Sequence, residues 1–150
     1  MNSFDKWDIR HLQLARLVAS WSKDPSTQTG AVISNGKKVI SLGFNGFPEG
    51  MPDDPESYAD RENKYSRVVH CEVNAVLLAE RSVRGFTLYT YPFMSCDRCA
   101  VTMIQAGIKK CVFPTLAEDK MERWAKAMEK SWKYFKECGV ECVEVPHEVI

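Results

Sequence analysis

HCEVNAVLLAE at residues 70–80 and SCDRC at residues 95–99 are the two segments around which this chain is organised. They contain His70, Cys96 and Cys99, which offer one imidazole and two thiolates, the ligand types that zinc prefers. A structural zinc site takes four protein ligands, whereas three leave one coordination position for water. The two segments therefore predict a catalytic zinc centre.

The spacing within each segment assigns a role to a fourth residue. Cys96 and Cys99 lie one helical turn apart, so both sulfurs can point to the same side and hold one ion. His70 and Glu72 are two residues apart and point in different directions, so only one of them can ligate that ion easily. We therefore expect Glu72 to act as the general acid and base beside the metal.

The rest of the chain alternates between helical and strand patterns. We predict helices at 5–21, 70–81, 96–106 and 117–138, and strands at 30–34, 38–42, 86–90, 108–113 and 140–145. Asn35-Gly36 predicts an antiparallel hairpin between the first two strands, and Ser95 is expected to cap the third helix. The order implies an α/β fold with three layers, α-β-α: a mixed five-stranded sheet, parallel after the first pair, with helices on both faces. Residues 43–67 lack periodicity and are predicted to form a loop.

Length and composition limit the class of protein. With 150 residues, 45% of them hydrophobic and 27% charged, we expect one soluble globular domain over 1–150. The 20 basic and 20 acidic residues balance, and no basic stripe is evident, so a long nucleic-acid substrate is disfavoured. No apolar run is long enough for a membrane span, and MNSFDKWDIRH is not a secretory signal, so a cytoplasmic location without membrane partners is expected.

Four cysteines lie outside the predicted zinc site. Cys71 and Cys111 are expected to be small buried apolar residues. Cys138 and Cys142 are separated by a glycine at an element boundary, which makes a second metal site there improbable.

The pattern His-x-Glu followed by Cys-x-x-Cys is the signature of zinc-dependent nucleobase deaminases. Over residues 7–113 the chain resembles more specifically the deoxycytidylate (dCMP) deaminases of the cytidine deaminase superfamily. The segments that carry this resemblance are WSKDPSTQTGAVI (21–33), GFNGFPEG (43–50), ENKY (62–65), HCEVNAVL (70–77) and SCDRCAVTMIQAGIKK (95–110).

The resemblance implies a cytidine-deaminase-like fold and hydrolysis of dCMP to dUMP and ammonia, which supplies the precursor of dTMP. It implies His70, Cys96 and Cys99 as zinc ligands and Glu72 as the general acid and base. It also implies that Asn45 binds the sugar 3′-hydroxyl and that Ala31 lies against the base. The family often forms homohexamers, is activated by dCTP and inhibited by dTTP, and carries Mg²⁺ on these effectors. The regulatory segment would be Gly43, Phe44, Asn45 and Gly46.

Some positions depart from the family pattern or remain open. Cys71 replaces a usual alanine, Ser95 a usual proline and Phe44 a usual tyrosine, the last of which bears on the effector response. Candidate phosphate donors are Ser22 and Lys23. Candidate aromatic contacts to the pyrimidine are Tyr89, Tyr91 and Phe93. The alternatives are a deaminase of another substrate (cytidine, guanine or a tRNA adenosine) and a non-catalytic zinc-binding or nucleotide-sensing module.

Overall fold

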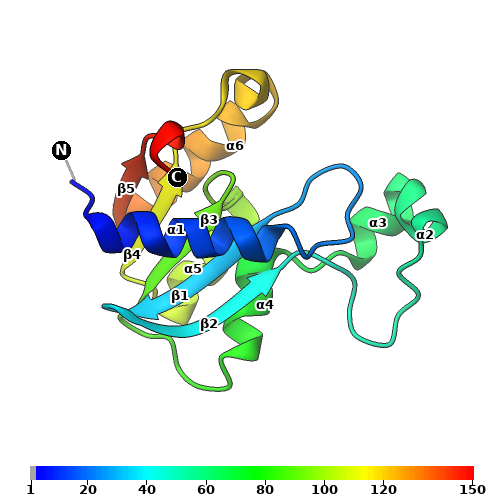
Figure 1. Ribbon diagram of the computed structural model, residues 1–150, viewed down its shortest axis with the longest axis horizontal. Helices are drawn as coiled ribbons and strands as arrows, with labels where there is room; N and C mark the ends of the chain where they lie inside the picture. The colour runs from blue at the N-terminus through cyan, green and yellow to red at the C-terminus, as the bar shows by residue number, and fades with distance from the viewer. Residues whose placement is uncertain (1–2) are drawn as a thin grey trace.

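The computed structural model describes residues 3–150 as a five-stranded sheet between layers of helices (Figure 1). The helices are α1 (Lys6–Ala19), α2 (Pro55–Ala59), α3 (Arg61–Arg67), α4 (Cys71–Leu78), α5 (Asp97–Ala106) and α6 (Glu118–Glu137), and a 3₁₀ turn covers His147–Val149. The strands are β1 (Gly30–Asn35), β2 (Lys38–Phe44), β3 (Thr87–Tyr91), β4 (Lys110–Pro114) and β5 (Glu141–Val145). The predicted three-layer α/β fold is confirmed.

The strands follow the order β2-β1-β3-β4-β5 across the sheet. The predicted hairpin joins β1 and β2, and its turn places Gly36 at a φ of 62°, a conformation that glycine adopts easily. β1 is also antiparallel to β3, whereas β3, β4 and β5 run parallel to one another. The parallel part of the sheet therefore begins only at β3.

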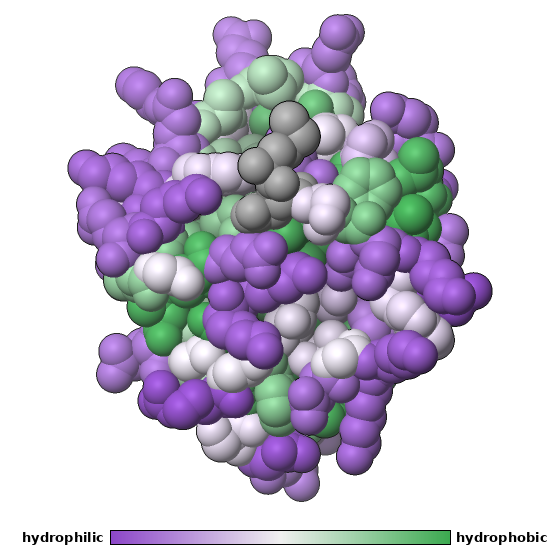
Figure 2. Space-filling model, turned by 90° about the vertical axis from the view of Figure 1, so that its left-hand side faces the viewer, coloured by the Kyte–Doolittle hydropathy of each residue, from purple (hydrophilic) through white to green (hydrophobic). Residues whose placement is uncertain are grey.

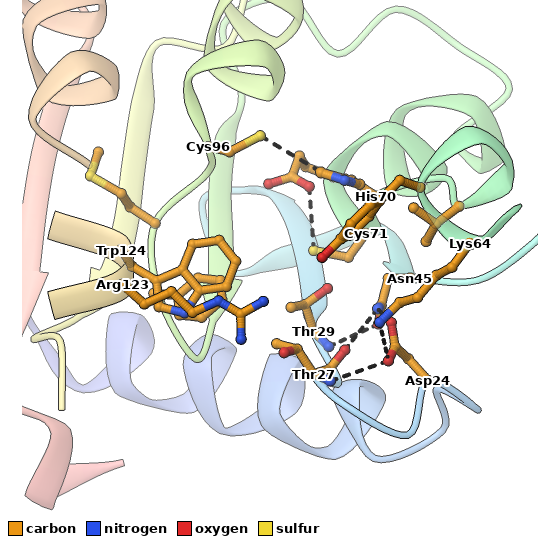
Figure 3. Close-up of a pocket in the computed structure, with 15 residues that line it drawn as sticks. Asp24, Thr27, Thr29, Asn45, Lys64, His70, Cys71, Cys96, Arg123 and Trp124 are labelled. Carbon is orange, nitrogen blue, oxygen red and sulfur yellow. Dashed lines mark hydrogen bonds and ion pairs between the residues drawn. The ribbon is translucent and has the colours of Figure 1, made fainter. Parts of the chain in front are cut away.

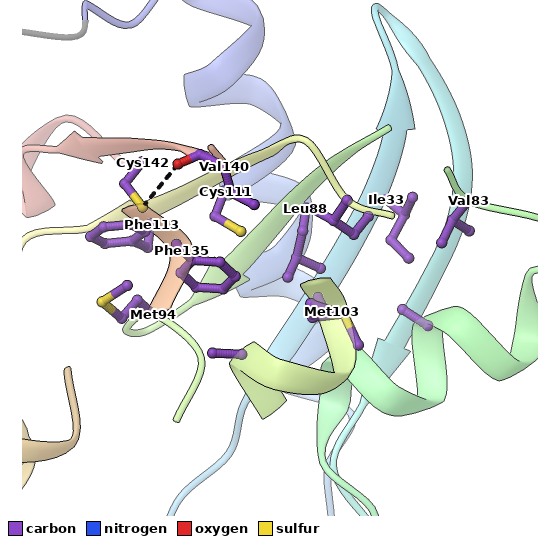
Figure 4. Close-up of a cluster of buried hydrophobic side chains, with 14 of the residues drawn as sticks. Ile33, Val83, Leu88, Met94, Met103, Cys111, Phe113, Phe135, Val140 and Cys142 are labelled. Atoms are coloured by element: carbon purple, nitrogen blue, oxygen red, sulfur yellow. Dashed lines mark hydrogen bonds between the residues drawn. The ribbon is translucent and has the colours of Figure 1, made fainter. Parts of the chain in front are cut away.

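Alternate residues of the strands face two separate cores. Ala31 and Ile33 of β1 face α4, α5 and α6, together with Leu88 and Phe113 (Figure 4). Val32 points the other way, toward α1, because successive side chains of a strand lie on opposite faces. This alternation explains why helices cover both faces of the sheet.

The prediction of a loop over residues 43–67 is wrong for the second half of this segment, which contains α2 and α3. The side chain of Asp54 accepts a hydrogen bond from the backbone N–H of Ser57, and Pro55 occupies the first turn of α2. Asp60 caps α3 in the same way through Asn63. These helices begin at polar caps and carry no apolar stripe, so hydrophobic periodicity could not reveal them.

The surface is mixed in character. On the face drawn in Figure 2, hydrophilic side chains surround small separate apolar groups. Within residues 3–150, every helix is too short or too polar to cross a lipid bilayer.

Candidate active site

His70 and Cys96 occupy equivalent positions, each as the N-cap of a helix that follows an extended segment. The Cys96 side chain accepts a hydrogen bond from the backbone N–H of Cys99 at 3.4 Å, so it caps α5 itself. The prediction that Ser95 caps this helix is therefore wrong. The Ser95 carbonyl instead accepts a hydrogen bond from the hydroxyl of Ser131 at 2.6 Å.

The three predicted ligands converge on one point. His70 Nδ1 lies 3.6 Å from Cys96 Sγ and 3.2 Å from Cys99 Sγ, and all three ligand atoms lie within 4.8 Å of one another. A tetrahedral zinc ion with bonds of about 2.0 Å to nitrogen and about 2.3 Å to sulfur would separate these atoms by about 3.5 Å. The residues present therefore fit a zinc ion, held through Nδ1 of the imidazole. Within residues 3–150, no other three His, Cys, Asp or Glu residues bring their ligand atoms this close together.

The electrostatics of this cluster favour a bound cation. A hydrogen bond from the Cys99 thiol, with a further contribution from His70, lowers the pKa of Cys96 to about 4. The same sulfur–sulfur hydrogen bond raises the pKa of Cys99, and the hydrogen bond with Cys96 raises the pKa of His70. Without a metal the three groups share protons, and a cation that replaces those protons finds its ligands already assembled.

Glu72 lies in the first turn of α4, where its side chain is buried and lines the cavity beside His70. The Cys71 thiol contacts the Glu72 Oε1 atom at 3.5 Å as a weak donor. Burial raises the pKa of Cys71 well above its usual value, so this residue stays a thiol and can keep donating. Cys71 is buried as predicted, but it also contacts the carboxylate.

A cavity of about 120 Å³ opens over this cluster (Figure 3). It is lined by Asp24, Thr27, Thr29, Asn45, Lys64, Tyr65, Val68, His70, Cys71, Glu72, Phe93, Met94, Cys96, Arg123 and Trp124. Four of the predicted site residues thus share one cavity wall: His70, Glu72, Cys96 and Asn45.

Asn45 is held in a single orientation beneath the cavity. Its Nδ2 donates to the Thr27 carbonyl at 2.9 Å and to Asp24 Oδ2 at 3.3 Å. Its Oδ1 accepts from the backbone N–H of Thr29 at 2.9 Å. Reversing the amide would place donors against donors, so this network fixes its direction. Both amide hydrogens are used, and the oxygen keeps one lone pair for a ligand hydroxyl.

Asp24 is the centre of the polar wall next to Asn45. Its carboxylate forms an ion pair with Lys64 at 2.9 Å, in which the side chains are only 3% and 12% exposed. It also accepts from the backbone N–H of Ser26 at 2.8 Å. Asp24 thus connects the segment after α1 to α3 and holds the rim of the cavity.

Three other predicted contact residues lie outside the cavity lining. Ser22 is buried, and its hydroxyl donates to the Asn45 carbonyl at 2.9 Å. Lys23 forms an exposed ion pair with Asp53 at 2.9 Å. Ala31 is fully buried in β1, within the core cluster below the site.

The segment Gly43–Gly46 is partly strand. Gly43 and Phe44 belong to β2, and the backbone of Gly43 touches that of α4 so closely that a Cβ there would lie 2.5 Å from Ala75 N. Phe44 is partly exposed and packs edge-on against Trp21, with ring centroids 6.1 Å apart. Gly46 pairs with Val69, directly before His70.

Of the three aromatic candidates, Phe93 lines the cavity. Tyr89 faces α1, where its hydroxyl donates to Asp8 at 2.8 Å. Tyr91 packs against His147, with ring centroids 5.7 Å apart.

Sequence reasoning missed several wall residues, chiefly Asp24, Lys64, Arg123 and Trp124. Asp24 and Lys64 lie inside segments that were recognised, but nothing in their spacing indicated that they pair. Trp124 lies in the helix predicted at 117–138, and periodicity cannot distinguish a core position from a cavity wall.

The sequence similarity of this chain to known proteins agrees with a zinc site at His70, Cys96 and Cys99. Residues 5–115 match the family described as the cytidine and deoxycytidylate deaminase zinc-binding region. An uncharacterised deaminase from Aliivibrio fischeri is 41% identical over 145 residues, which cover 97% of each chain. Human deoxycytidylate deaminase is 36% identical over 115 residues, which cover 72% of this chain and 64% of the human protein.

Solved structures share the fold. The dCMP deaminase of cyanophage S-TIM5 superposes with a TM-score of 0.72 at 19% identity, over 95% of this chain and 100% of that one. A bifunctional deaminase and reductase from Thermotoga maritima gives a TM-score of 0.66 at 22% identity, over 95% of this chain and 38% of that one. With the family match over residues 5–115 and the convergent His70, Cys96 and Cys99, the chain belongs to the zinc-dependent cytidine and deoxycytidylate deaminase family.

Proposed function

We propose that this enzyme hydrolyses dCMP to dUMP and ammonia. The observation that carries the proposal is that His70, Cys96, Glu72 and Asn45 line one cavity, so metal ligands, a proton carrier and a hydroxyl acceptor are within reach of one small molecule. The human and cyanophage proteins named above, described as deoxycytidylate and dCMP deaminases, support a nucleotide substrate.

The chemistry follows from the groups that surround the cavity. A zinc ion held by His70, Cys96 and Cys99 would lower the pKa of a bound water toward neutrality. The Glu72 carboxylate is placed to take a proton from the attacking water and to deliver it to N3 of the cytosine ring, which would make the amino-bearing carbon more electrophilic. As the oxygen of the water forms a bond to the amino-bearing carbon, Glu72 moves the second proton of that water to the amino group. The carbon–nitrogen bond then breaks, so that ammonia leaves and a carbonyl remains on the ring. The Cys71 thiol beside Oε1 helps to fix the direction of the carboxylate.

We expect the polar wall formed by Asn45 and Asp24 to orient the substrate. The free lone pair of Asn45 Oδ1 is suited to accept a hydrogen bond from the sugar 3′-hydroxyl. Ser22 contributes indirectly, because its hydroxyl holds the Asn45 carbonyl.

Regulation by dCTP and dTTP, with Mg²⁺ on the triphosphate, is a further part of the proposal. The segment concerned, Gly43–Gly46, contacts α4 through Asn74, whose Nδ2 donates to the Phe44 carbonyl at 2.8 Å. Just before the segment on β2, Ser41 Oγ donates to the Ala75 carbonyl of the same helix at 2.7 Å. A ligand that moved this segment would therefore act on the helix that carries Glu72. Assembly into a homo-oligomer, with a hexamer favoured, would be measured by light scattering with and without dCTP.

One experiment tests the proposal against its alternatives. Ammonia release is measured with dCMP, CMP, cytidine, guanine and tRNA, each with and without dCTP. The proposal requires dCMP to dominate. Dominant activity on another substrate would replace it with a different deaminase, and no activity on any substrate by zinc-loaded protein would favour the nucleotide-sensing module.

A further inference from the structure

The cavity wall that faces Asp24 and His70 comes from α6, where Arg123 and Trp124 project toward the cavity (Figure 3). Both residues lie beyond residues 5–115, the part of the chain that the family shares. Family membership therefore says nothing about what these two side chains do. Their role has to come from their own surroundings.

The charges in the cavity distinguish Arg123 from the other basic side chain there. Lys64 is compensated by Asp24 at 2.9 Å. Arg123 takes part in none of the ion pairs formed by residues 3–150. Arg123 thus brings to the cavity a positive charge that no neighbouring carboxylate neutralises.

Aromatic stacking holds this cation in place. The Arg123 Cζ atom lies 4.9 Å from the centroid of the Trp124 ring, and that ring packs against Phe93 at 4.8 Å. A guanidinium group over an aromatic face keeps its in-plane N–H donors free. The stacking therefore keeps the N–H donors of the Arg123 guanidinium group pre-oriented. Binding then costs less ordering entropy than it would for a freely rotating side chain.

Resting on the proposed function, we infer that Arg123 binds the 5′-phosphate of the nucleotide substrate and sets the preference for nucleotide over nucleoside. A phosphate monoester brings up to two negative charges and three acceptor oxygens, which match the guanidinium fork in a bidentate contact. The two other candidates for this role, Ser22 and Lys23, are engaged with Asn45 and Asp53 outside the cavity lining.

The exposed position of Arg123 allows it to be substituted without disturbing the core. No residue of 118–130 is buried, and α6 is anchored through Ser131 and Phe135. Replacing Arg123 should therefore leave the fold intact. Lys126 provides a matched control, because it is an exposed cation on the same helix and does not line the cavity.

The test compares Arg123→Gln, Arg123→Lys and Lys126→Gln with the unsubstituted enzyme. Calorimetry measures binding of the product dUMP and of deoxyuridine, and kcat/KM is measured for dCMP and deoxycytidine. We expect Arg123→Gln to weaken dUMP binding and to lower kcat/KM for dCMP by about 10- to 100-fold, the range for charged hydrogen bonds. Binding of deoxyuridine should not change, Arg123→Lys should fall between, and Lys126→Gln should match the unsubstituted enzyme.

The outcomes separate this inference from the proposed function. If the unsubstituted enzyme prefers nucleotides and Arg123→Gln keeps that preference, the inference is overturned while the proposed function stands. Loss of the preference in Lys64→Gln instead would assign the phosphate to Lys64 and also overturn it. If the unsubstituted enzyme binds dUMP no better than deoxyuridine, the proposed nucleotide substrate itself fails.

Discussion

Ser131 of α6 donates a 2.6 Å hydrogen bond from its hydroxyl to the carbonyl oxygen of Ser95, the residue directly before Cys96. The Ser131 side chain is fully buried, so no solvent competes for this bond. It ties the last helix to the start of the metal-binding segment. The helix that lies outside the shared family region is thus connected to both the zinc ligands and the cavity wall.

Removing this hydroxyl should loosen the connection. Ser131→Ala leaves the buried Ser95 carbonyl without its donor, which should lower the free energy of unfolding by about 1–3 kcal/mol. Denaturant titration of the zinc-loaded protein measures the change. Thr102→Ala is a suitable control, because the Thr102 hydroxyl bonds the Arg98 carbonyl at an exposed site. Equal losses in both variants would contradict a special role for Ser131.

Glu72 should be needed for turnover and not for metal binding. Glu72→Gln keeps the shape of the side chain but cannot carry a proton, so kcat should fall by about 10²- to 10⁴-fold or more with zinc content unchanged. Metal analysis and ammonia release on the same sample test both halves. Glu80→Gln, exposed just beyond α4, should keep full activity. Substantial turnover by Glu72→Gln would exclude the proposed mechanism.

The metal should contribute to stability as well as chemistry. Cys96→Ser and Cys99→Ser each remove a thiolate, so zinc content should drop and the melting temperature should become insensitive to chelator. Zinc at about 1,000 times its Kd would add about 4 kcal/mol to the native state. Cys138→Ser replaces an exposed cysteine outside the cluster and should behave like the unsubstituted protein. Full zinc content in Cys99→Ser would refute the ligand assignment.

The contact between β2 and α4 should not tolerate a side chain. A Cβ at Gly43 would lie 2.5 Å from Ala75 N and 2.6 Å from Cys71 O, both backbone atoms. Gly43→Ala should therefore cost about 1–3 kcal/mol through forced displacement of α4, and it should reduce activity because Glu72 moves with that helix. At Gly46 a Cβ would meet only the Tyr58 hydroxyl at 3.8 Å, so Gly46→Ala is the matched control. Thermal unfolding that gave equal stabilities would show that the helix shifts freely.

His11 should make stability depend on pH. Burial lowers the pKa of His11 below its usual 6.5, against smaller opposing effects of the hydrogen bond to Lys37 and of Asp8 and Asp5. Below that usual value the unfolded chain binds more protons than the folded one, so stability is lost as the pH falls from 7 toward 5. His11→Gln cannot take up this proton, and its stability curve should fall less steeply. Parallel curves for the two proteins in denaturant titrations would contradict this prediction.

Features that depend on short-range spacing could be predicted from the sequence. Cys96 and Cys99 are three residues apart at a helix start, and that local geometry brings their sulfurs near the His70 imidazole once β3 joins the two segments. Short runs rich in β-branched and aromatic residues predicted the strands, and the Asn35-Gly36 turn specified the hairpin between the first two. Local steric preferences and hydrophobic patterning are sufficient for such features.

Which residues surround the cavity depends on tertiary packing and could not be predicted from the sequence. Asp24 pairs with Lys64, 40 positions along the chain, and Arg123 faces them from a helix that begins after β4. Hydrophobic periodicity did not predict α2 and α3, which begin at polar caps. Cys96, and not the predicted Ser95, caps α5. Contacts of this kind depend on how whole elements pack, because side chains from distant segments meet only after the sheet and its helices have assembled.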